Sequence, residues 1–152
     1  MFQRGYDNEL GEFELATCNT QGDLFADCQH LEDYPCDAYD FITKFMAGEI
    51  AKDMDRDVSM CHTWGTDQIY ETFFYDTHIE KHNGNVYIDS DTLFWAGYLF
   101  RYWVWWLGDS SNEIINKVSA ELVCSTYIGL HTVDPKQAIV MLKDAVKWVK
   151  TL

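Results

Sequence analysis

The side chains best suited to acid–base chemistry lie in the stretch YIGLHTVDP. Tyr127 and His131 are four residues apart and would share a helix face, and Asp134 follows at the start of another predicted helix. With Arg101 and Tyr102 they could form a polar pocket that binds an anion or nucleotide, or transfers protons. The alternative is structural, with His131 satisfying loose backbone groups at a helix corner. The residue types favour this alternative, so an enzyme is the less favoured class.

Histidines and cysteines form two candidate metal sites. His78 and His82, in HIEKH, have the spacing by which two imidazoles on one helix share a metal ion. A solvated helix end, where the helix dipole favours histidine, is the alternative. Cys28, His30 and Cys36 are also ligand types, but their spacing matches no standard zinc site. We therefore expect neither a bound metal nor another cofactor.

The five cysteines are odd in number and show no compact pairing pattern. The opening MFQRGYDNEL has neither the cationic nor the apolar region of a signal peptide, so secretion is not expected. These features predict a cytoplasmic protein whose thiols are reduced and packed as small hydrophobic groups.

Acidic residues dominate the surface charge. The net charge is −14, and residues 1–60 carry fourteen acids against four bases. Such a surface repels phosphate backbones, so direct nucleic-acid binding is not expected, whereas a basic protein partner would be attracted. Asp53, Asp55 and Asp57 resemble the start of a calcium loop, but Val58 occupies the position that requires glycine.

The elements that must position these side chains centre on an aromatic helix, LFWAGYLFRYWVWWL, at 93–107. Its apolar run of about 15 residues is too short to span a bilayer and is interrupted by Arg101. Ser90 is the expected N-cap, and Gly108 the expected left-handed residue at the C-terminal end.

The aromatic helix is apolar on nearly every face, so other helices or a partner must surround it. We expect its own domain to enclose it. The alternative leaves one aromatic face exposed to anchor a partner, because Trp and Tyr dominate interface hot spots. The candidate partner-binding residues are Trp95, Tyr102, Trp105 and Trp106, together with Asp53, Asp55 and Asp57.

Further helices are predicted over about 37–54, 66–84, 110–118, 119–130 and 134–152. A capping box joins Ser110 to Glu113, and Asp134-Pro135 is a strong helix start. Residues 1–36 are expected to be an acidic, irregular extension in which EFELAT could form a short strand, and 37–152 a helical domain. The predicted fold class is all-α, a compact bundle of five or six helices around the central aromatic helix.

Three segments, DFITKFMAGEIAKDMD, FWAGYLFRYWVWWLGDSSNEI and YIGLHTVDPKQAI, resemble a group of short, largely uncharacterised bacterial and phage proteins of toxin–antitoxin or mobile-element context. The likeness covers about residues 37–146, and Asp109 before the serines departs from the group's pattern. The resemblance implies a small cytoplasmic accessory, antitoxin or counter-defence protein rather than a housekeeping enzyme.

Two functional classes follow from these observations. The favoured class is a protein that binds a partner protein through its acidic surface and exposed aromatic side chains. The alternative is a small enzyme or an anion- or nucleotide-binding module that uses the Arg-Tyr-His-Asp set.

Overall fold

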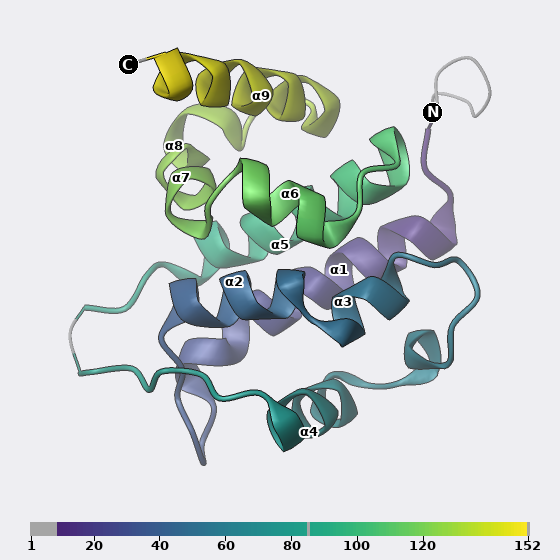
Figure 1. Ribbon diagram of the computed structural model, residues 1–152, viewed down its shortest axis with the longest axis vertical. Coiled ribbons are helices and arrows are strands. Elements are labelled where there is room, and N and C mark those ends of the chain that lie inside the picture. Colours follow the sequence, from purple (N-terminus) through teal and green to yellow (C-terminus); the bar gives the residue numbers. More distant parts are fainter. Residues whose placement is uncertain (1–8, 85, 152) are drawn as a thin grey trace.

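The computed structural model describes residues 9–84 and 86–151, and within these ranges the protein is all-α, as predicted (Figure 1). Two short 3-10 turns, Cys28–His30 and Met60–Thr63, join some of the helices. The α-helices are α1 (Glu12–Asp27), α2 (Ala38–Ala47), α3 (Glu49–Met54), α4 (Thr66–Asp76), α5 (Ser90–Leu107), α6 (Ser111–Lys117), α7 (Ala120–Ser125), α8 (Tyr127–Leu130) and α9 (Pro135–Thr151).

The aromatic helix α5 lies at the centre of the bundle, which confirms the predicted architecture. It runs alongside α1 and also contacts α6, α7, α8 and α9 (Figure 1). Trp103 and Phe100 of α5 are completely buried. None of the helices in the described part of the chain is long and apolar enough to cross a membrane. The ring-rich segment is therefore a core element, as its length and the interrupting arginine predict.

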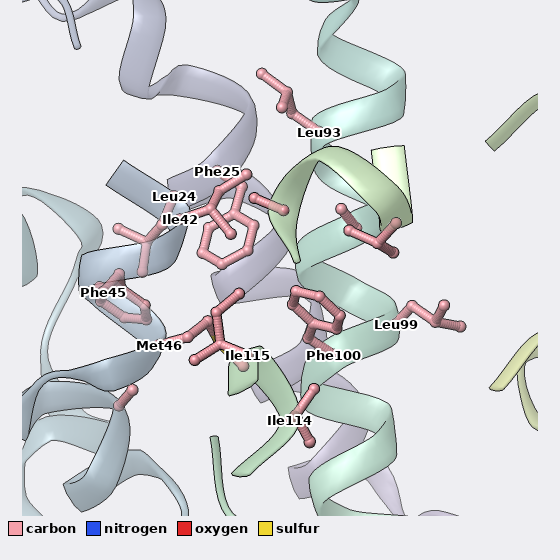
Figure 2. Close-up of a cluster of buried hydrophobic side chains, with 14 of the residues drawn as sticks. Leu24, Phe25, Ile42, Phe45, Met46, Leu93, Leu99, Phe100, Ile114 and Ile115 are labelled. Atoms are coloured by element: carbon pink, nitrogen blue, oxygen red, sulfur yellow. The ribbon is translucent and has the colours of Figure 1, made fainter. Parts of the chain in front are cut away.

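Side chains from α1, α2, α5 and α6 meet in one hydrophobic core (Figure 2). Phe25 of α1 makes an edge contact with Phe45 of α2, with ring centroids 5.9 Å apart. Phe41 of α2 contacts Phe73 of α4 in the same way at 5.2 Å. These rings stabilise the packing through their buried area and their edge-to-face geometry. Helix α2 thereby connects α4 to α1, which runs alongside α5.

The prediction of an irregular segment or short strand near the N-terminus is wrong, because Glu12–Asp27 is the helix α1. The Gly11 amide donates to the Glu14 carboxylate at 2.7 Å and closes the first turn. The buried face of α1 includes polar or small residues such as Thr17, Gln21 and Gly22. A stripe of this composition lacks the apolar periodicity by which amphipathic helices are recognised.

Two predicted helices are shorter than expected. The helix predicted over 37–54 is divided into α2 and α3 at Gly48, whose backbone is extended (φ −95°, ψ 178°). The helix predicted over 66–84 ends at Asp76, and the segment after it pairs with the chain ahead of α2, where the Asp37 amide donates to the Glu80 carbonyl at 2.8 Å. The helix predicted over 119–130 is likewise divided, into α7 and α8, at Thr126. With α1 in addition, the described residues form nine α-helices rather than five or six.

Local signals for helix ends are largely confirmed. Gly108 ends α5 in the left-handed conformation (φ 80°), and the capping box between Ser110 and Glu113 is present. Pro135 is the first residue of α9. The predicted N-cap Ser90 is instead the first helical residue, after Asp89.

The α1–α5 crossing brings two backbones unusually close at Gly97. A Cβ atom placed on Gly97 would lie 2.6 Å from the Gln21 carbonyl oxygen and 3.0 Å from the Gly22 Cα. Because both obstacles are backbone atoms, no side-chain rotation could relieve the contact. Glycine is thus required here for close approach of the helices.

We predict that Gly97→Ala lowers the free energy of unfolding by about 2–3 kcal/mol, since the added methyl group forces α1 and α5 apart. Urea titration followed by circular dichroism would measure the loss. Gly129→Ala is the matched control, because a Cβ atom at this helical glycine of α8 meets no atom within 4 Å. Equal stability of the two variants would contradict the close packing.

Candidate functional site

Arg101 is buried completely inside the bundle rather than in a solvent-accessible pocket. Its guanidinium donates to Asp55 Oδ1 at 2.6 Å and twice to Gln21 Oε1, at 3.1 and 2.7 Å. Gln21 in turn donates to the Gly97 carbonyl at 2.9 Å. The arginine thereby links α1, α5 and the residue that ends α3.

Asp55 also holds the first turn of α6. Its Oδ2 accepts the Ser111 backbone N–H at 2.9 Å, and the Ser111 hydroxyl contacts both Asp55 Oδ1 and the Arg101 guanidinium. Burial lowers the pKa of Arg101, and the Asp55 carboxylate opposes this effect. Arg101 is therefore held in an internal ion pair and is inaccessible to an external anion.

Removing the carboxylate would leave the guanidinium buried without its charge partner. We predict that Asp55→Ala lowers the free energy of unfolding by about 3 kcal/mol, as is typical when one member of a buried pair is deleted. Chemical denaturation would measure the difference.

Asp53→Ala is the matched control for this variant. Asp53 lies two residues away and makes an exposed contact of 4.0 Å with Arg56, an interaction that contributes little to stability. A loss as large in Asp53→Ala as in Asp55→Ala would refute the importance of the internal pair.

Tyr127 and His131 line a groove of about 420 Å³ between α5 and the corner formed by α8 and the start of α9, here called the aromatic groove. The rings in its lining are Phe94, Trp95, Tyr98, Tyr127 and His131. Asp91, Leu99, Val133 and Pro135 complete it. The groove is thus mostly aromatic and apolar, with one carboxylate.

The predicted Arg-Tyr-His-Asp set is not brought together at this groove. Arg101 belongs to the internal network, and Tyr102 is buried, which raises its pKa, with nearby Asp134 contributing. Asp134 accepts the Lys136 amide at the start of α9. His131 stacks on Tyr127 at 4.3 Å and donates through Nδ1 to the Tyr127 carbonyl, which also accepts the His131 backbone N–H.

A second groove, of about 460 Å³, brings together several candidate partner-binding residues. Asp55, Asp57 and Trp105 contribute to its lining, and Asp53 lies next to them in the chain. We call it the acidic groove, and its complete lining is Leu10, Glu14, Asp55, Arg56, Asp57, Val58 and Trp105.

Of the four aromatic residues named as exposed candidates, Tyr102 is contradicted by its burial, whereas the three tryptophans, Trp95, Trp105 and Trp106, are partly exposed. The Trp105 indole N–H donates to the Thr17 hydroxyl at 2.7 Å, so this ring is fixed against α1. Val58, which lines the acidic groove, is 78% exposed, and Met60, two residues further along the chain, is 74% exposed. Helical periodicity could not identify either residue, because both lie outside any α-helix.

The candidate metal ligands do not form a site within residues 9–84 and 86–151, where no group of three suitable side chains converges. His78 and His82 lie beyond the end of α4, so they do not share a helix face. His82 stacks on Tyr87 at 4.1 Å, and His30 contacts the same ring at 4.6 Å.

The cysteines are buried thiols. Burial raises the pKa of Cys18, Cys36 and Cys124 from 9.0 to about 12, and raises that of Cys28 well above 9.0. A raised thiol pKa means that the folded chain retains protons that the unfolded chain loses. The contribution of these four thiols to stability is therefore constant below about pH 9 and decreases as the pH rises toward 12.

We predict that the free energy of unfolding decreases between about pH 9 and pH 12, and that Cys18, Cys28, Cys36 and Cys124 each contribute up to about 1.4 kcal/mol per pH unit. Urea titrations at several pH values would measure the slope. Cys124→Ser removes one such thiol and should reduce the slope by about one proton's contribution. A slope identical to that of the unaltered chain would show that the pKa of Cys124 is the same in the folded and unfolded chain.

No family model, curated protein or solved structure matches the chain. The function must therefore be argued from the two grooves and their chemistry.

Proposed function

We propose that this protein binds a basic partner protein, and that the acidic groove is the binding surface. The observation that supports the proposal is the pairing of three carboxylates with an exposed Val58 in one groove. A partner segment that presents an apolar side chain flanked by lysines or arginines would match both features.

Charge supplies long-range attraction in this proposal. The lining holds three carboxylates, Glu14, Asp55 and Asp57, and one basic residue, Arg56, and the chain as a whole carries −14. Such a field accelerates encounters with a cationic surface and is weakened by salt. The same field disfavours contact with the phosphate backbone of nucleic acids.

Apolar contact supplies the short-range part. Val58 and Met60 are mostly exposed, and the Phe13 ring, also exposed, lies near Trp105 with centroids 5.9 Å apart. Burial of such side chains against a partner removes apolar surface from water, which contributes about 25 cal/mol per Å². Trp105, fixed by its bond to Thr17, provides a rigid wall at low entropic cost.

The resemblance to bacterial and phage proteins leads us to propose an antitoxin or counter-defence inhibitor acting in the cytoplasm. In that role the chain would neutralise a basic protein by covering a cationic surface. The reduced, buried thiols are compatible with this compartment.

The test is affinity purification with the full chain and with Val58→Asp, followed by mass spectrometry and by titration of any retained protein. Val58→Asp adds negative charge but removes the apolar contact, so we expect affinity to fall about tenfold or more. Binding by the unaltered chain should weaken as salt concentration increases.

Ile128→Asp is the control, because Ile128 is also an exposed aliphatic residue (80% exposed) but lies on α8, outside the acidic groove. It should bind as the unaltered chain does. Equal retention of the same partner by Val58→Asp, or affinity that does not change with salt, would reject the acidic groove as the binding surface.

A further inference from the structure

The aromatic groove has the features of a site for a cation rather than for an anion. Its lining contains five rings and one carboxylate, and none of the residues that line it is lysine or arginine. Asp91 is exposed and makes no ion pair with any other described residue. A carboxylate in the lining of a ring-lined groove attracts positive ligands.

The rings come from α5 and from the α8 corner, and one pair between these two elements meets at a steep angle. Trp95 of α5 and Tyr127 of α8 are edge to face, with centroids 5.7 Å apart and planes at 73°. Phe94 and Tyr98 lie along the same helix with centroids 6.2 Å apart. Non-parallel rings can direct more than one π-face toward a common ligand, which is the arrangement that binds methylated ammonium groups.

The ring positions are held by the fold. The Tyr127 ring is stacked on His131, whose Nδ1 is hydrogen-bonded to the Tyr127 carbonyl. Phe94 packs against Gly22 of α1, where an added Cβ atom would lie 2.7 Å from the ring. A ligand entering the groove would therefore meet side chains that lose little further freedom on binding.

We propose that the aromatic groove binds a small organic cation that carries a methylated ammonium group. Its positive charge would lie over the rings of Trp95, Tyr98 and Tyr127, with Asp91 as the counter-charge. A group of this kind is weakly hydrated and leaves water for ring faces readily, whereas a phosphate or carboxylate would be repelled by Asp91. This binding is independent of the acidic groove.

The test compares choline with 3,3-dimethyl-1-butanol, the neutral analogue in which carbon replaces the quaternary nitrogen. NMR titration of the full chain, followed at the tryptophan indole N–H signals, would measure both affinities. We expect choline to bind saturably and the neutral analogue to bind about tenfold more weakly, because shape is retained and charge is removed.

Two matched pairs of variants test whether choline binds at the aromatic groove. Tyr127→Phe should retain choline binding and Tyr127→Leu should lose it, because only the former keeps the ring. Asp91→Asn should weaken binding several-fold, whereas Asp89→Asn should not. Asp89 is also an exposed acid, but it neither lines the groove nor caps α5 through its side chain. Circular dichroism of each variant would verify folding.

Three outcomes would overturn the proposal. Equal affinity for choline and its neutral analogue would show that the groove recognises apolar shape and not positive charge. If inorganic phosphate shifted the same indole N–H signals with higher affinity than choline, the groove would be a site for an anion rather than a cation. Failure of choline to cause a saturable shift in the folded chain would exclude recognition of the methylated ammonium group.

Discussion

The buried ion pair between Arg101 and Asp55 constrains the arrangement of the helices more than any other polar contact described. A guanidinium removed from water must be matched by a charge and by acceptors, and these come from three other parts of the chain: Gln21 on α1, Asp55 after α3 and Ser111 on α6. Sliding α1 along α5 would separate Arg101 from Gln21. Such a pair adds little net stability relative to an apolar core, but it disfavours alternative packings in which the charge is unmatched.

Helix α5 connects this interior to both grooves. Trp95 lines the aromatic groove and Trp105 lines the acidic groove. Ten residues of α-helix separate these rings by about 15 Å along the axis. The same helix forms a wall of each groove. The shapes of both grooves therefore depend on the position of α5 relative to α1. The close contact of Gly97 with the backbone of α1, at a position between the two tryptophans, determines that relative position.

Sequence reasoning succeeded where the signal is local. The left-handed Gly108, the capping box at Ser110 and the Pro135 helix start each depend on a few adjacent residues, and each is present. It failed for α1, whose buried face is partly polar because Gln21 serves Arg101. Asp55, Asp57 and Trp105 of the acidic groove, and Trp95, Tyr127 and His131 of the aromatic groove, were named as candidates from the sequence. Their grouping into two grooves could not be predicted, since the partners of a side chain depend on tertiary packing.

Asp55 belongs at once to the interior and to the surface. Its side chain is 14% exposed, lines the acidic groove and is the charge partner of Arg101. A cation that approaches this carboxylate from outside therefore shares it with the guanidinium inside. Occupancy of the groove and cohesion among α1, α3, α5 and α6 are thereby thermodynamically linked. A substitution at position 55 would therefore change both the groove and the interior, whereas a substitution at Asp57, two residues away, would change a groove carboxylate and leave the Arg101–Asp55 pair in place.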